Sequence, residues 1–114
     1  NQNYVTQGVT TVVTGNCGSG PVDAARFFAA VEAGGAGTNV VHQAPHNSIR
    51  DAVMGNENRA PTADELKRME ELVEKALADG AVGLASGLIY NPGTYARTEE
   101  LVALARVVGR RGGL

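Results

Sequence analysis

The chain contains a single cysteine, no tryptophan and only 4% aromatic residues among its 114 residues. One cysteine forms no internal disulfide, so nothing in the sequence indicates an oxidising compartment, and we expect a cytoplasmic location. An excess of basic charge is also lacking, because ten Lys and Arg are scattered among twelve Asp and Glu. This balance argues against nucleic-acid binding, which requires a basic surface.

Long apolar runs are missing as well. The apolar stretches are far shorter than the roughly 20 residues that cross a bilayer, so we expect no membrane association. The remaining composition, 43% hydrophobic and 19% charged, is typical of one globular domain spanning residues 1–114. The sequence begins without Met, on what resembles the tail of a helix, and ends where a new strand should begin. It therefore reads as an internal segment of a longer protein.

Glycine, by contrast, is abundant, with 15 residues. Short β-branched or apolar runs between turn residues are typical of buried parallel strands. Three such runs occur, at residues 9–14, 38–44 and 81–85, and the last is the weakest because it contains Gly83. Helical patterns follow the strands at residues 22–32, 62–77 and 98–110, with a further short helical turn at 47–54.

The best helix signal is the capping box at Thr62 and Glu65, followed by apolar residues at helical spacing up to Gly80. Thr98, Glu99 and Glu100 are expected to cap the last helix. The predicted fold class is thus α/β with the order βαβαβα and a parallel sheet, either open and doubly wound or part of a barrel.

Both architectures place function at the carboxyl ends of strands, where the loops at 15–20, 44–50 and 86–96 lie. Cys17 lies in the first loop between glycines. A lone cysteine is most often a small buried residue, but it is also a metal ligand where histidines accompany it, or a nucleophile where a base is positioned beside it.

Two histidines and two tyrosines occupy the strand ends. His42 is expected to pack outward from its strand against a helix, whereas His46, beyond Pro45, is expected to face the strand-end cavity. Tyr90 and Tyr95 could bind a substrate carboxylate or pack beneath their loop.

Three stretches in order resemble one family, the zinc-dependent N-acyl-D-amino-acid deacylases of the amidohydrolase superfamily. Residues 8–18 (GVTTVVTGNCG) are similar to the segment that bears the family's cysteine metal ligand. Residues 45–55 (PHNSIRDAVMG) resemble a Gly-His-x-x-x-Arg-x-Ala-Val-Met segment, with Pro45 in place of the usual glycine. Residues 80–96 (GAVGLASGLIYNPGTYA) resemble a Gly-Leu-Ser-Thr-Gly-Leu-x-Tyr-x-Pro-Gly segment.

The resemblance implies strands two to four, with their helices, of a (β/α)8 TIM-type barrel. It implies that Cys17 is a zinc ligand and that Tyr90 and His46 lie at the substrate, an N-acyl-D-amino acid whose amide is hydrolysed. The family's other metal-ligand histidines and its catalytic aspartate fall outside this segment, so we assign no catalytic residue here. We expect the isolated segment to be inactive and, with open sheet edges, to self-associate unless the remainder of the barrel covers it.

Two alternatives remain. A hydantoinase-like or dihydroorotase-like amidohydrolase would use a modified lysine in place of Cys17. A non-catalytic α/β binding or assembly module would lack the family's further metal ligands on either side of the segment.

Overall fold

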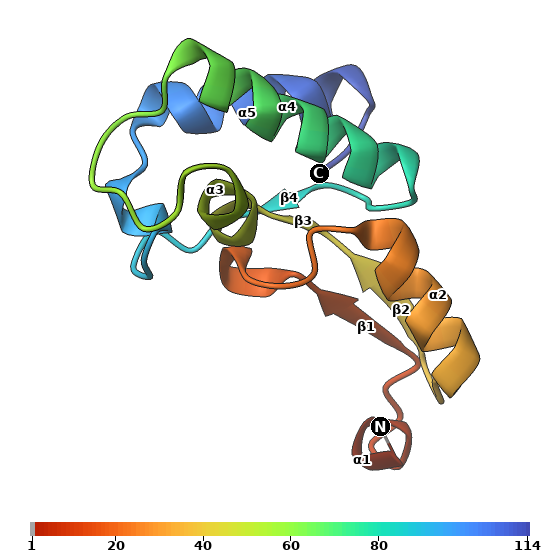
Figure 1. Cartoon of the computed structure of the whole chain (residues 1–114). Helices are drawn as coiled ribbons and strands as arrows, with labels where there is room; N and C mark the ends of the chain where they lie inside the picture. Colours follow the sequence, from red (N-terminus) through yellow and green to blue (C-terminus); the bar gives the residue numbers. More distant parts are fainter. Residues whose placement is uncertain (1) are drawn as a thin grey trace.

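The structure, a computed structural model, describes residues 2–114 (Figure 1). After a short helix α1 (Gln2–Val5), strands β1 (Thr11–Thr14) and β2 (Asn39–His42) pair in parallel, with Val12 opposite Val40. Helix α2 (Ala24–Gly34) connects them and lies beside them. Its first turn is capped by Asp23, whose carboxylate accepts a hydrogen bond from the backbone N–H of Arg26 at 3.0 Å.

The second predicted strand is divided in two. β2 ends at His42, and β3 (Ala44–Pro45) pairs in parallel with β4 (Leu84–Ala85) instead of with β1. The third strand, β4, covers only the last two residues of the predicted run at 81–85. A backbone hydrogen bond nevertheless extends the pairing before β4: the Val82 N–H donates to the His42 carbonyl at 2.9 Å. Residues 82–84 are also paired with Leu114, which donates to the Val82 carbonyl and accepts from Leu84.

Helix α3 (His46–Met54) begins directly after β3, where the sequence predicts a helical turn at 47–54. With the short α1 and the divided second strand, the observed order contains two helices and one strand more than the predicted βαβαβα. A 3-10 turn η1 (Asn16–Gly18) follows β1, and a second one, η2 (Gly93–Tyr95), precedes the last helix. The predicted α/β class with parallel strands is confirmed at this level.

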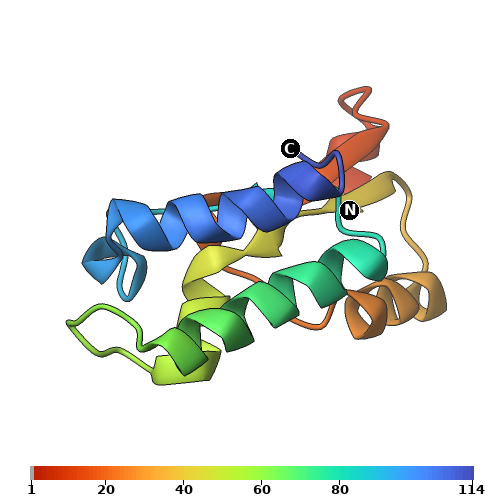
Figure 2. The same ribbon diagram turned by 90° about the horizontal axis from the view of Figure 1, so that it is seen from above.

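Helices α4 (Ala63–Ala78) and α5 (Thr98–Arg110) pack side by side (Figure 2). The predicted capping box of α4 is present: the Glu65 N–H donates to the Thr62 hydroxyl at 3.2 Å, and the Thr62 N–H donates to the Glu65 carboxylate at 2.7 Å. The Arg59 guanidinium and the Thr62 backbone N–H together lower the pKa of Glu65 from 4.5 to about 2.

The predicted cap of α5 is wrong in detail. Arg97 is the residue before the first turn, and neither it nor Thr98 caps the helix through a side chain. Glu100 is buried, because its position one turn before Leu104 places it on the inward face. Leu104, Val107 and Val108 are buried on the same helix, whereas Ala105 is exposed.

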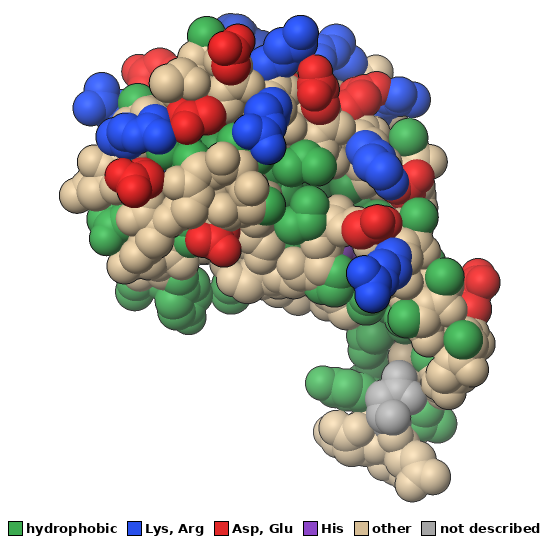
Figure 3. Space-filling model, in the orientation of Figure 1, with side chains coloured by type: hydrophobic (Ala, Val, Ile, Leu, Met, Phe, Trp, Pro, Cys, Tyr) green, Lys and Arg blue, Asp and Glu red, His purple; other side chains and the backbone are tan. Residues whose placement is uncertain are grey.

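The apolar core lies mainly between α3, α4, α5 and the short strands. Within residues 2–114 no helix is long and apolar enough to cross a membrane. Charged side chains of both signs cover the helical side of the molecule (Figure 3). The buried apolar residues are Ala24, Ala44, Ile49, Met54, Met69, Val73, Ala76, Ala81, Leu104, Val107 and Val108.

Candidate active-site edge

The three predicted strand-end loops meet at one edge of the molecule. Turn η1 follows β1, helix α3 follows β3, and the loop after β4 returns across both. Gly87 in that last loop lies against the backbone of Cys17, so closely that a Cβ atom at Gly87 would be 2.1 Å from the Cys17 carbonyl oxygen. This position therefore requires glycine, and residues 70 positions apart in sequence are held together.

Cys17 is exposed at this edge and has left-handed backbone angles (φ 57°, ψ 20°). It is the one residue other than glycine with positive φ among those that the structure describes. Such a conformation is uncommon outside turns and functional sites, since a Cβ is crowded there. The flanking Gly15 and Gly18 also have positive φ. Cys17 is thus not a small buried residue, which leaves the other two alternatives open.

Asn47, which the sequence reading missed, joins the loops. Its side chain is 2% exposed, and its amide nitrogen donates to the carbonyls of Gly87 at 2.9 Å and Tyr90 at 3.4 Å. The Asn47 oxygen would lie 2.4 Å from a Cβ at Gly18 and 2.5 Å from a Cβ at Gly93. One buried amide therefore sets the spacing between η1, α3 and the loop that carries Tyr90.

His46 lies behind this edge and is fully buried. Its Nδ1 is 3.0 Å from the Ser86 hydroxyl, and its Nε2 is 2.8 Å from the Glu100 carboxylate. The second Glu100 oxygen is 3.7 Å from Arg50. Both ring nitrogens of His46 therefore have protein partners, and the expectation that it faces the strand-end cavity is wrong.

Arg50 completes this buried cluster. Its guanidinium donates to the backbone carbonyls of Pro92 at 3.1 Å and Arg59 at 2.6 Å. It thereby ties α3 to the loop before η2 and to the segment that leads into α4. A signal for Glu100 was available, because it shares a helical face with Leu104 and Val107, whereas nothing local marked Asn47.

Tyr90 is 55% exposed, and its backbone is fixed by Asn47 and by a bond from the Thr94 N–H at 2.9 Å. Its side chain thus projects from an anchored backbone, while Tyr95 is half-buried in η2. His42 packs against α2, as expected, with its ring centroid 4.7 Å from that of Phe27.

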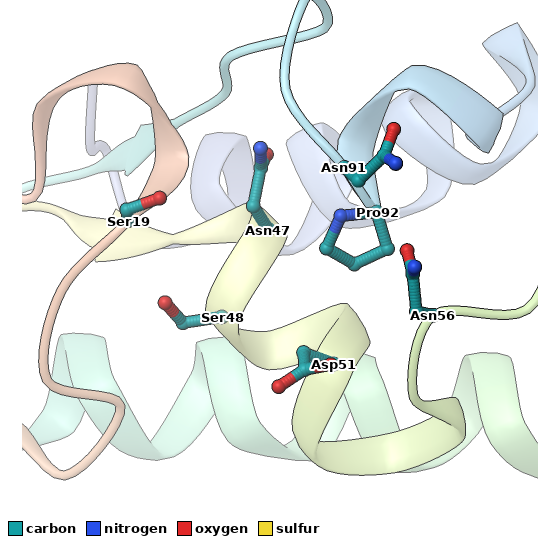
Figure 4. Close-up of a pocket in the computed structure, with 7 residues that line it drawn as sticks. All are labelled: Ser19, Asn47, Ser48, Asp51, Asn56, Asn91 and Pro92. Atoms are coloured by element: carbon teal, nitrogen blue, oxygen red, sulfur yellow. The ribbon is translucent and has the colours of Figure 1, made fainter.

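A polar cavity of about 330 Å³ lies at the same edge (Figure 4). Asp51 supplies its only charge. The three strand-end loops all contribute to its walls, together with the end of α3. The lining residues are Ser19, Asn47, Ser48, Asp51, Asn56, Asn91 and Pro92.

The described residues do not by themselves complete a metal site. Residues 2–114 contain no group of three or more His, Cys, Asp or Glu side chains placed to hold a metal ion. His42 and His46 are buried with both nitrogens bonded, which leaves Cys17 as a single outward-facing sulfur donor. Thiolate is a strong zinc ligand, so the chemistry of Cys17 is compatible with one position of a zinc site.

No family model matches the chain. Curated relatives do: the chain is 35% identical to D-aminoacylase of Alcaligenes xylosoxydans xylosoxydans over 133 residues, covering 96% of this chain and 28% of the relative. It is 38% identical over 130 residues to N-acyl-D-glutamate deacylase of the same organism, covering 95% and 27%.

Two solved structures are also similar. A D-aminoacylase that defines a novel subset of amidohydrolases superposes with a TM-score of 0.86 at 33% identity. N-acyl-D-glutamate deacylase from Bordetella bronchiseptica, complexed with zinc and a phosphonate inhibitor, superposes with a TM-score of 0.89 at 36% identity. Each match covers 96% of this chain and 28% of the other. The predicted resemblance is confirmed, and the chain spans little more than a quarter of the relatives' length.

Proposed function

We infer that this chain is an internal segment of an N-acyl-D-amino-acid deacylase, part of its (β/α)8 barrel domain. The complete protein then hydrolyses the amide of an N-acylated D-amino acid to a carboxylate and a free D-amino acid, with zinc as its cofactor. The observation that carries this proposal is the outward-facing Cys17 thiol at a parallel-strand end, in a chain that matches deacylases over nearly its whole length.

When bound, zinc would polarise the amide carbonyl of the substrate and activate a water molecule near neutral pH. Cys17 provides one ligand to it, and the rest come from parts of the protein outside residues 1–114. The exposed phenol of Tyr90 donates a hydrogen bond to the substrate carboxylate. The buried His46, bonded to Ser86 and Glu100, supports the loop after β4 and the start of α3, and acts on the substrate through that support.

The same proposal accounts for the open sheet face. Val13 on β1 is 47% exposed and Val82 is 38% exposed, although both belong to extended segments rich in apolar residues. In a barrel, alternate strand residues fill the interior. The remainder of the barrel would cover these side chains.

The test uses the protein encoded by the complete reading frame. Purified with zinc, it should hydrolyse N-acetyl-D-amino acids and leave the L-enantiomers intact, and Cys17→Ala should abolish this activity. Val102→Ala, on the exposed side of α5, is the matched control and should retain it. Zinc-independent hydrolysis, or full activity of Cys17→Ala, would refute the proposal.

A further inference from the structure

His42 contacts both ends of the loop that carries Cys17. Its Nδ1 is 2.8 Å from the hydroxyl of Thr14, the last residue of β1, and its Nε2 is 2.9 Å from the carbonyl oxygen of Pro21. Cys17 lies between these two anchor points, three residues after one and four residues before the other. A single ring from the neighbouring strand therefore closes the loop.

The chemistry of these contacts fixes the direction of one of them. A carbonyl oxygen only accepts, so Nε2 carries a proton and donates it to Pro21. The Thr14 hydroxyl lies within hydrogen-bond distance of both Nδ1, at 2.8 Å, and the Val41 carbonyl oxygen, at 3.1 Å. Both ring nitrogens of His42 therefore have partners at the ends of the loop.

The ring itself has little room to move. His42 is 0% exposed, and the rings of Phe27 and Phe28 on α2 lie 4.7 and 6.3 Å from it between centroids. On the loop side, a Cβ at Gly20 would lie 3.6 Å from the ring, and a Cβ at Gly15 would lie 2.2 Å from the Gln43 carbonyl oxygen. Gly15 and Gly20, near the two ends of the loop, therefore both lie close to the residues at the end of β2.

We propose that His42 is a positioning residue for Cys17, which holds the thiolate where a metal ion can be bound. The proposal rests on the zinc-dependent function inferred above. A ligand whose backbone is already fixed loses less conformational freedom on binding, and partners that orient metal ligands typically contribute ten- to hundredfold in metal affinity. His42 acts through Thr14 and Pro21 and touches neither metal nor substrate.

The first part of the test measures amide hydrogen exchange at residues 15–21 in the complete, metal-free protein. His42→Phe keeps a buried ring but removes both hydrogen bonds, and exchange in this loop should accelerate at least tenfold. Thr14→Val removes only one of the two contacts and keeps a residue that favours strands. Exchange should accelerate less in this variant, which takes the place of His42→Phe in the test if His42→Phe fails to fold. Val73→Ala, in the core on α4, controls for general destabilisation. In this variant, exchange at residues 15–21 should accelerate no more than exchange in the rest of the protein.

The second part measures zinc affinity by competition with a chelator. His42→Phe should weaken zinc binding roughly ten- to hundredfold, and His42→Gln, whose amide nitrogen can replace Nε2, should restore part of the loss. Loop exchange no faster than in Val73→Ala, or unchanged zinc affinity in His42→Phe, would overturn the proposal. Failure of the wild-type protein to bind zinc would instead refute the proposed function, while the exchange comparison still decides whether His42 holds the loop.

Discussion

The two halves of the molecule are held together by different forces. In the first half, residues 9–42, Ala24 is the only buried apolar residue, and the other ten core residues lie between Ala44 and Val108. A groove of about 270 Å³ runs between β1, β2 and α2, lined by Val12, Phe27 and Val40 among others. The second half, residues 44–114, contains the packed core and the buried cluster of His46, Glu100 and Arg50.

The contrast explains how a ligand residue can be placed on a thinly packed element. The Cys17 loop is fixed by polar contacts from His42 and by glycine-dependent backbone contacts with Gly87 and Asn47. The contacts with Gly87 and Asn47 transmit position from the better-packed half, since α3 and the loop after β4 belong to it. Rigidity of the second half therefore supports the site in the first.

The largest expected effect is at Arg50. Arg50→Met removes the counter-charge of buried Glu100 and leaves the carbonyls of Pro92 and Arg59 without their donor. Breaking a buried charge pair in this way should cost about 3–5 kcal/mol in the free energy of unfolding. Urea denaturation checks it, with Arg68→Met on the exposed side of α4 as the control. A loss equal to that of the control would mean that the cluster does not stabilise the second half.

Truncations of one apolar side chain in each half compare their packing directly. Met69→Ala, at a fully buried position in α4, should cost about 2–5 kcal/mol. Val40→Ala, half-buried in β2 beside the groove, should cost less, about 1 kcal/mol, since fewer contacts are lost. Equal losses in urea denaturation would remove the distinction between the halves.

Tyr90 tests whether the anchored loop serves binding. Tyr90→Phe in the complete protein removes a hydrogen bond to a charged group, about 1.5–3 kcal/mol, or roughly ten- to a hundredfold in kcat/KM. Steady-state kinetics with an N-acetyl-D-amino acid measures this, and the loss should disappear for a substrate amide that replaces the carboxylate. Tyr95→Phe, half-buried in η2, is the matched control.

The smallest expected effect lies at the start of α4. Thr62→Ala should cost about 1 kcal/mol through loss of the cap. Glu65 adds a pH dependence: its folded pKa of about 2 is below its ordinary 4.5, so its contribution is complete above pH 4.5 and is lost as pH falls toward 2. The stability difference between wild type and Glu65→Gln should therefore shrink over that range. A difference that is constant with pH would contradict the assignment.

The elements predicted from sequence are those whose signals are local. The capping box, the apolar spacing of α4 and the glycine after it all lie within 20 residues, and that helix formed as predicted. The division of the second strand depends on which partner each half meets, so the run at 38–44 carries no sign of it.

The same distinction applies to the site. The neighbours of Cys17 in sequence predict a role for it as a metal ligand, but they do not predict its left-handed backbone angles or its close contact with Gly87, 70 residues away. His46 precedes Asn47 in one predicted loop, yet it turns inward because Ser86 and Glu100, 40 and 54 residues away, offer it partners. Contacts at that separation are set by the fold and have no local pattern.

The most direct test of the central claim is the absorption spectrum of the complete protein with cobalt(II) in place of zinc. A thiolate ligand at Cys17 predicts a sulfur-to-cobalt charge-transfer band in the near ultraviolet that Cys17→Ser lacks and Val102→Ala retains. A cobalt-loaded wild-type protein without that band, or a Cys17→Ser variant that keeps it, would contradict the account.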